Sequence, residues 1–306
     1  MANNRNCNRA ISKGFNQLKK KDRTLDLACV LFATMTAYFG PCLWNFLSRK
    51  NLVDKTVKQL DVYNMLKVMI AERKNDPNFF SISGPCDPYN LETSMAARHA
   101  LAHGYYDNIS NHWMSYLMAW IEVLRLVNAP NAAAKVKNVL DELILKKNNP
   151  LEVQVTSLSA PRFLTGEIIP QLPSDMNNTE YIKATKIMVK LYRCLTKYLG
   201  LTLRDRYLRN QSKSRCDSEI DPQTLLFDLL DEWHNNHQTN PTYQADLATI
   251  QTAKEGRNKI FHGEILMTLQ NWNFYFVSFI DLCNLLHARP TAEKIAEVHN
   301  QLASEN

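Results

Sequence analysis

The sequence predicts an all-α fold made of two tandem helical bundles related by pseudo-twofold symmetry. Three observations predict it: long segments with helical hydrophobic spacing, few glycines and an internal repeat. Glycine occurs only 8 times in 306 residues, which disfavours a turn-rich β-protein and a dinucleotide-binding fold. The motifs G-x-G-x-x-G, G-x-x-x-x-G-K and H-E-x-x-H are absent, so the commonest signatures of nucleotide and zinc chemistry are missing.

The repeat relates residues that lie 159 or 160 positions apart in the chain. Matched pairs at an offset of 159 include Arg98 with Arg257, His103 with His262, Gly104 with Gly263 and Trp113 with Trp272. Upstream the offset becomes 160, as in Gly40 with Gly200. A period this long indicates a domain duplication rather than a solenoid.

The repeat predicts an organisation in four parts. They are a basic N-terminal arm (1–25), a first helical domain (26–147), a proline-containing linker (148–176) and a second helical domain (177–306). The linker holds four prolines and lacks the helical period of its flanks. Its β-branched run at 153–156 predicts one short strand.

The apolar spacing predicts five helices in each half. Those of the first half cover 24–50, 56–74, 91–103, 109–127 and 133–147, and those of the second cover 179–209, 221–236, 247–263, 268–287 and 291–303. We expect the first helix to bend near Gly40–Pro41. Asp221 and Pro222 predict an N-cap followed by proline at the first helical position. Gly104 is suited to the position that follows a helix C-terminus.

Charge and cysteine usage bound the class of protein. The net charge is +6, and residues 1–25 alone hold seven basic residues and one acidic residue. Such an arm is either a solvated tail or an anchor for a polyanion such as RNA. Seven scattered cysteines without C-x-x-C fit a reducing compartment, and no secretory signal is visible. We therefore expect an intracellular protein, cytoplasmic or nuclear, that needs no cofactor or metal.

One apolar stretch raises the question of a membrane. Residues 27–44 carry no charge, which is borderline for a spanning helix. Their counterpart in the second half, 187–204, contains four basic residues and is unsuited to a bilayer. The stretch is therefore predicted to be a buried bundle helix, with no membrane as a partner.

One group of residues, two arginines and two histidines, is a candidate for a catalytic site. The sequences ARHALAHG and GRNKIFHG contain the only two R-x-x-x-x-H motifs of the chain, Arg98–His103 and Arg257–His262, in register in the two repeats. On one helix, residues five apart are rotated by about 140° and separated by about 7.5 Å. A single helix therefore cannot bring Arg and His together, whereas two facing helices can. The alternative is structural, with each arginine capping helix-end carbonyls and each histidine satisfied at a C-terminus.

All-helical units that carry R-x4–6-H at the end of a helix resemble HEPN domains. Asn258, directly after Arg257, matches the polar residue that the family often has there, and His99 takes that place in the first half. The R-H-x-x-x-H form resembles the variant seen in a ribosomal-RNA-processing endonuclease. The resemblance covers most of both halves and rests on the motif together with the order of helices.

The resemblance implies a metal-independent endoribonuclease that acts on RNA at a composite site. His103 and His262 would serve as base and acid, one taking the proton of the 2′-OH and the other protonating the 5′-oxygen. Arg98 and Arg257 would hold the scissile phosphate. His99 and Asn258 would support the site, and the product would be a 2′,3′-cyclic phosphate.

Two further questions stay open from the sequence. The basic run at 204–215 is either a solvated loop or a contact for the RNA backbone, through Arg204, Arg206, Arg209, Lys213 and Arg215. The alternative function is a catalytically silent HEPN-like module that binds RNA, a nucleotide or a protein partner. A homodimer or a regulatory protein partner is compatible with either function.

Overall fold

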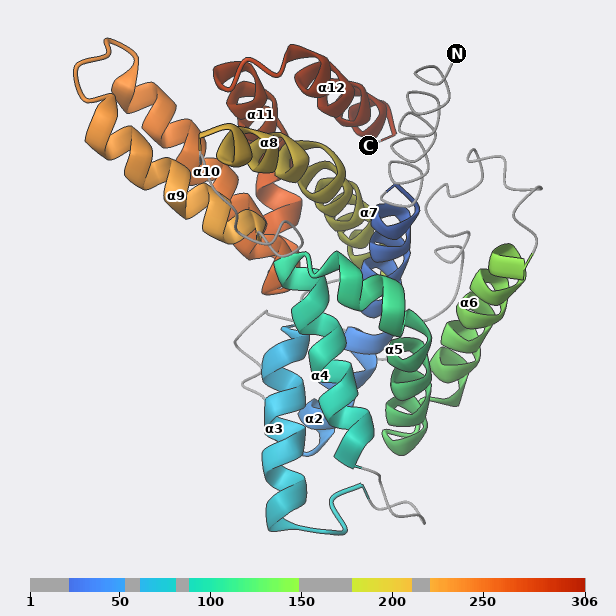
Figure 1. Ribbon diagram of the computed structural model, residues 1–306. Helices are drawn as coiled ribbons and strands as arrows, with labels where there is room; N and C mark the ends of the chain where they lie inside the picture. The colour runs from blue at the N-terminus through green and yellow to red at the C-terminus, as the bar shows by residue number, and fades with distance from the viewer. Residues whose placement is uncertain (1–21, 53–60, 81–87, 149–177, 211–220, 306) are drawn as a thin grey trace, which may run out of the picture.

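The computed structural model describes residues 22–52, 61–80, 88–148, 178–210 and 221–305, and its regular structure there is entirely helical (Figure 1). The all-α prediction is confirmed over these residues. The linker at 149–177, the strand predicted at 153–156 and residues 1–21 of the arm lie outside them.

The helices follow the predicted order in both halves. The first half contains the long helix Asp22–Arg49, with η1 (Met35–Phe39) and α2 (Gly40–Arg49) inside it, then α3 (Val62–Asn75), α4 (Pro88–His103), α5 (Tyr106–Leu126) and α6 (Pro130–Asn148). The second half contains α7 (Asn178–Cys194), η4 (Leu195–Leu199), α8 (Gly200–Asn210), α9 (Pro222–Asn236), α10 (Tyr243–Phe261), α11 (Ile265–Leu285) and α12 (Arg289–Ser304).

Where the sequence predicts a bend, just before Gly40–Pro41, the helix contains a π-turn, and a π-turn occurs at the equivalent place in the second half. η1 ends at the residue before Gly40, and η4 ends at the residue before Gly200. The second half has no proline at this point, so the π-turn rather than proline is the shared irregularity. A Cβ on Gly200 would lie 2.8 Å from the Leu195 carbonyl oxygen, which explains the glycine there.

The N-terminal helix also corrects one predicted boundary. The arm was expected to extend to residue 25, but the helix is already formed at Asp22. Leu25, which the prediction assigned to the arm, is buried. Among the described residues, this helix has the length and apolar character of a membrane span, and 72% of its most apolar window is buried inside the protein. That burial agrees with the bundle helix that the sequence predicts.

The two halves share one hydrophobic core. Buried residues of both halves form a single contiguous cluster. At its centre, the ring of Phe32 stacks on that of Tyr192 with 4.1 Å between ring centroids, and Tyr181 donates a hydrogen bond to the carbonyl oxygen of Thr36. The long helix of each half therefore packs directly against that of the other. Figure 1 shows the pairs α3–α4 and α9–α10 extending in different directions from this centre.

Candidate active site

The two predicted motifs lie at two helix C-termini with the same local geometry. His103 is the last residue of α4, and His262 is the C-cap of α10. The next residues, Gly104 and Gly263, have φ angles of 66° and 64°, which glycine adopts without strain. Beyond them, the amides of Tyr105 and Glu264 each donate to the carbonyl five residues earlier, at 3.0 Å. This pattern is a Schellman motif, so the glycine predicted to end the helix places each histidine in the last turn.

Two aspartates at helix N-termini face these C-termini. Asp61 caps α3 by accepting a hydrogen bond from the amide of Tyr63, and Asp221 caps α9 by accepting one from the amide of Gln223. The N-cap predicted at Asp221 is therefore confirmed. Asp61 lies 160 positions earlier and was not predicted as a cap, because the sequence pattern extended the helix back to residue 56.

Each aspartate joins an arginine of its own half to a histidine of the other half. Asp61 lies 3.3 Å from the Nη2 atom of Arg98 and 3.0 Å from the Nδ1 atom of His262. Asp221 lies 2.8 Å from the Nδ1 atom of His103 and 3.5 Å from Nη2 of Arg257. Every contact of the first set has a counterpart in the second. Both histidines are thus oriented by a carboxylate from the opposite half.

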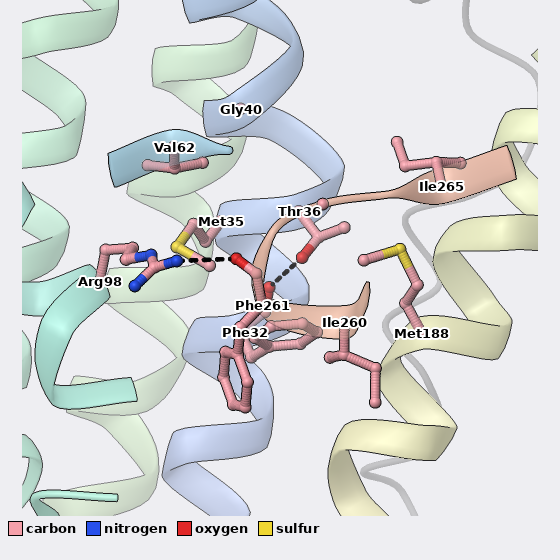
Figure 2. Close-up of a pocket in the computed structure, with 11 residues that line it drawn as sticks. Phe32, Met35, Thr36, Gly40, Val62, Arg98, Met188, Ile260, Phe261 and Ile265 are labelled. Carbon is pink, nitrogen blue, oxygen red and sulfur yellow. Dashed lines mark hydrogen bonds between the residues drawn. The ribbon is translucent and has the colours of Figure 1, made fainter. Parts of the chain in front are cut away.

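The arginines also donate hydrogen bonds from one half to the other. The Nη2 atom of Arg98 donates to the carbonyl oxygen of Phe261 at 2.9 Å, as Figure 2 shows. Nη2 of Arg257 donates to the carbonyl oxygen of Ala102 at 2.8 Å. Each arginine therefore caps the helix end that carries the other half's histidine. The carbonyl contact considered from the sequence exists, but it is made across the halves.

Both arginines are buried together with the carboxylates and carbonyl oxygens that they contact. Only 8% of Arg98 and 3% of Arg257 is exposed. Burial lowers the pKa of Arg257 to about 10, because the nearby positive charge of Arg98 adds to it and Asp221 offsets only part of the effect. Both guanidinium groups remain charged at neutral pH. In this conformation the arginines position Asp61, Asp221 and the two helix ends.

The carboxylate of Asp61 is held in its ionised form. Burial alone would raise its pKa, but the hydrogen bond from His262 and the charge of Arg98 outweigh that effect and hold the pKa below its usual value. An ionised carboxylate can only accept hydrogen bonds. The Nδ1 atom of His262 therefore carries the proton in the contact with Asp61, which leaves Nε2 bare in the neutral ring.

The side chains of both histidines are partly exposed. The side chain of His103 is 27% exposed and that of His262 is 49% exposed. Within the described part of the chain, Nε2 of neither ring has a hydrogen-bond partner. A ring that is fixed through Nδ1 and open at Nε2 is the arrangement that a general base requires.

The two predicted supporting residues occupy different settings. The ring of His99 lies 4.3 Å from that of His103, measured between centroids, and 5.4 Å from that of Tyr105. Asn258 instead accepts a hydrogen bond from Nη1 of Arg257 at 3.4 Å. Partial desolvation of this exposed side chain, together with the charges of His103 and Arg98, lowers the pKa of His99. The lowered pKa favours the neutral ring at pH 7.

The RNA contact predicted along 204–215 stays a prediction. Arg206 forms an ion pair with Glu232, and its guanidinium lies 5.7 Å from the ring centroid of Trp233. Its guanidinium therefore packs against α9, and its role as an RNA contact stays a prediction. Arg204 and Arg209 lie on α8, and Arg209 is exposed. Lys213 and Arg215 lie outside the described residues.

A small pocket borders Arg98 at the junction of the halves. Met35, Val62, Phe261 and Ile265 are among the residues that line it (Figure 2). It has room for about one water molecule, so it cannot hold a nucleotide. The candidate site is therefore the surface formed by the two helix ends. No group of three or more metal-ligating side chains suited to a metal ion occurs in the described ranges.

Comparison with family models, curated proteins and solved structures finds no match for this chain.

The ionised state of Asp61 makes a prediction for acid stability. Because the folded pKa lies below the unfolded value, its stabilising contribution is full above about pH 4 and is lost as pH falls through the folded pKa. Asp61→Asn should lower the free energy of unfolding by about 1–3 kcal/mol at pH 7, with a smaller difference from the wild type at pH 3. Urea denaturation across this range measures both values. An exposed-site control, Asp107→Asn, should show little difference at either pH, and a pH-independent loss for Asp61→Asn would contradict the assignment.

Proposed function

We propose that this chain is a metal-independent endoribonuclease that cleaves RNA by attack of the ribose 2′-OH on the adjacent phosphate. The site would be composite, with His103 and His262 as base and acid. The observation that carries the proposal is the exchange of His–Asp pairs between the halves. These contacts bring both histidines to the junction of the halves, where each is oriented by a carboxylate.

The chemistry needs two imidazoles in opposite protonation states. One neutral histidine takes the 2′-OH proton at Nε2, and the 2′-oxygen bonds to phosphorus. The other, protonated histidine gives its proton to the departing 5′-oxygen as the P–O bond breaks. The products are a 2′,3′-cyclic phosphate and a 5′-hydroxyl. Asp61 and Asp221 would hold the rings and stabilise the imidazolium that forms.

The arginines support the proposal in a way that differs from the role expected first. Their Nη2 atoms contact carboxylates and carbonyl oxygens, so they would set the positions of the histidines. Arg98 donates to the carbonyl oxygen of the residue before His262, and Arg257 donates to that of the residue before His103, which supports one site shared by both halves. The matched contacts also favour a pseudo-twofold pair of HEPN-like units. Direct contact of Arg98 or Arg257 with the phosphate remains a prediction that needs a rearrangement.

The second candidate is a catalytically silent module that binds RNA, a nucleotide or a protein partner. The burial of both arginines favours it, because a scaffold needs them only to join the halves. The partly exposed, oriented histidine rings favour the enzyme, since a purely structural histidine has no reason to leave its second nitrogen open. Cleavage separates the two candidates.

The test is cleavage of a fluorescent single-stranded RNA in EDTA, with the 2′-deoxy oligonucleotide as a substrate control. His103→Ala and His262→Ala should each lower the rate by about 10²–10⁴-fold. His112→Ala, an exposed histidine on α5, should cleave at the wild-type rate. Equal cleavage by all four proteins, or cleavage of the deoxy control, would overturn the proposal. No cleavage by folded wild-type protein would support the silent module.

A further inference from the structure

The two His–Asp pairs match each other, but their surroundings do not. At an offset of 159, His99 corresponds to Asn258 and Tyr105 corresponds to Glu264. The ring of His103 therefore has aromatic neighbours, whereas the corresponding positions of the second half hold polar residues. On the second side, Glu264 is held in an ion pair with Lys259 at 2.7 Å.

The aromatic side of the site forms a continuous surface. The ring of Tyr105 stacks beside that of His103, with 5.8 Å between centroids and 25° between planes, and the ring of His99 contacts both. His99 is exposed, and the other two are half-buried. We call His99, His103 and Tyr105 the aromatic face. An exposed ring such as His99 contributes little to the core, so packing alone does not account for the face.

The chemistry of this face suits a nucleobase. Unpaired bases stack on Tyr and His rings with little dependence on sequence. The lowered pKa of His99 favours a neutral ring at pH 7, which does not offer a charge to an anion but still offers a flat face. The face also includes His103, whose Nε2 atom would act on the backbone. A base stacked there would be next to the ribose or phosphate that reacts.

We infer that the aromatic face receives one nucleobase of single-stranded RNA, and that the strand therefore crosses the site in a single polarity. This inference rests on the proposed function, because it assigns the substrate's base to one side of the proposed site. The polar side at His262 would contact only ribose and phosphate. Without the aromatic face, the two matched His–Asp pairs would accept the strand in either direction.

The test uses a 2′-O-methyl RNA that cannot react, with 2-aminopurine placed at each position in turn. Stacking quenches 2-aminopurine fluorescence, so the wild type should quench one position most strongly. Tyr105→Glu and His99→Asn place the second-half residues in the first half. Tyr105 is the N-cap of α5 and Glu264 is the N-cap of α11, so the substitution uses a residue that the fold already accepts there.

Each variant should reduce the quench and weaken RNA binding by roughly 10-fold. His112→Ala, at an exposed position on α5 outside the aromatic face, is the control and should keep the wild-type quench and affinity. An undiminished quench in both variants, equal quenching on both sides of the site, or no binding by the wild type would overturn the inference. Because this assay needs no cleavage, its result is distinct from a failure of the nuclease proposal. A wild type that quenches one position but never cleaves would refute only the nuclease.

Discussion

Arg257→Ala is expected to lower the free energy of unfolding by about 3–5 kcal/mol. The substitution leaves the buried carboxylate of Asp221 without its arginine and removes the hydrogen bond to the Ala102 carbonyl oxygen. That carbonyl belongs to the other half, so the loss weakens the junction as well as the local cluster. Urea denaturation followed by circular dichroism measures the effect.

A surface arginine provides the control for this prediction. Arg289 is 85% exposed in an ion pair with Glu293 one helical turn away. Arg289→Ala should therefore change stability by about 0.5 kcal/mol or less. Arg98→Ala should behave like Arg257→Ala, because its contacts with Asp61 and Phe261 have the same form. Losses in either buried variant no larger than that of the control would mean that the arginines do not join the halves.

Asp221→Asn is expected to lower the rate of RNA cleavage by about 10²–10⁴-fold with the fold retained. Asparagine caps a helix about as well as aspartate, so α9 should still begin at the same residue. Its amide, however, does not enforce the proton on Nδ1 of His103 and cannot stabilise an imidazolium. Because Asp221 acts through His103, the pH dependence of cleavage should also change.

The measurement compares pH–rate profiles of the wild type, Asp221→Asn and Asp76→Asn. Asp76 is an exposed carboxylate after α3 that, among the described residues, accepts a hydrogen bond from the backbone amide of Asn78, so its variant serves as the control. The wild type and the control should share a bell-shaped profile, as expected for one acid and one base. A reduced rate with an unchanged profile would point to a structural defect, and a wild-type rate would remove Asp221 from the mechanism.

Local patterns in the sequence predicted much of the fold of this protein. Helical spacing and few glycines indicated the all-α fold, and the 159-residue offset placed Arg98–His103 and Arg257–His262 at equivalent helix ends. Gly104 marked the end of α4, because a residue in the left-handed region is needed there. These features depend on residues close to one another in the chain, which sequence patterns report well.

These local patterns could not predict the contacts between the halves. Asp61 pairs with His262, 201 positions away, and no local period encodes such a distance. A repeat comparison offers one signal that could have found it, since Asp61 and the recognised cap Asp221 are 160 positions apart. The burial of Arg98 and Arg257 also follows from packing between the halves. The ion pair of Arg206 with Glu232 joins α8 to α9 within the second half and is likewise a tertiary contact.

The central claim is that the two halves of one chain complete a single cleavage site. The most direct measurement mixes equal amounts of His103→Ala and His262→Ala and assays RNA cleavage in EDTA beside the wild type and each variant alone. If one chain holds the whole site, the wild type cleaves and the mixture stays as inactive as either variant. Restored cleavage in the mixture would mean that the site forms between two chains. A wild type without cleavage would contradict the claim outright.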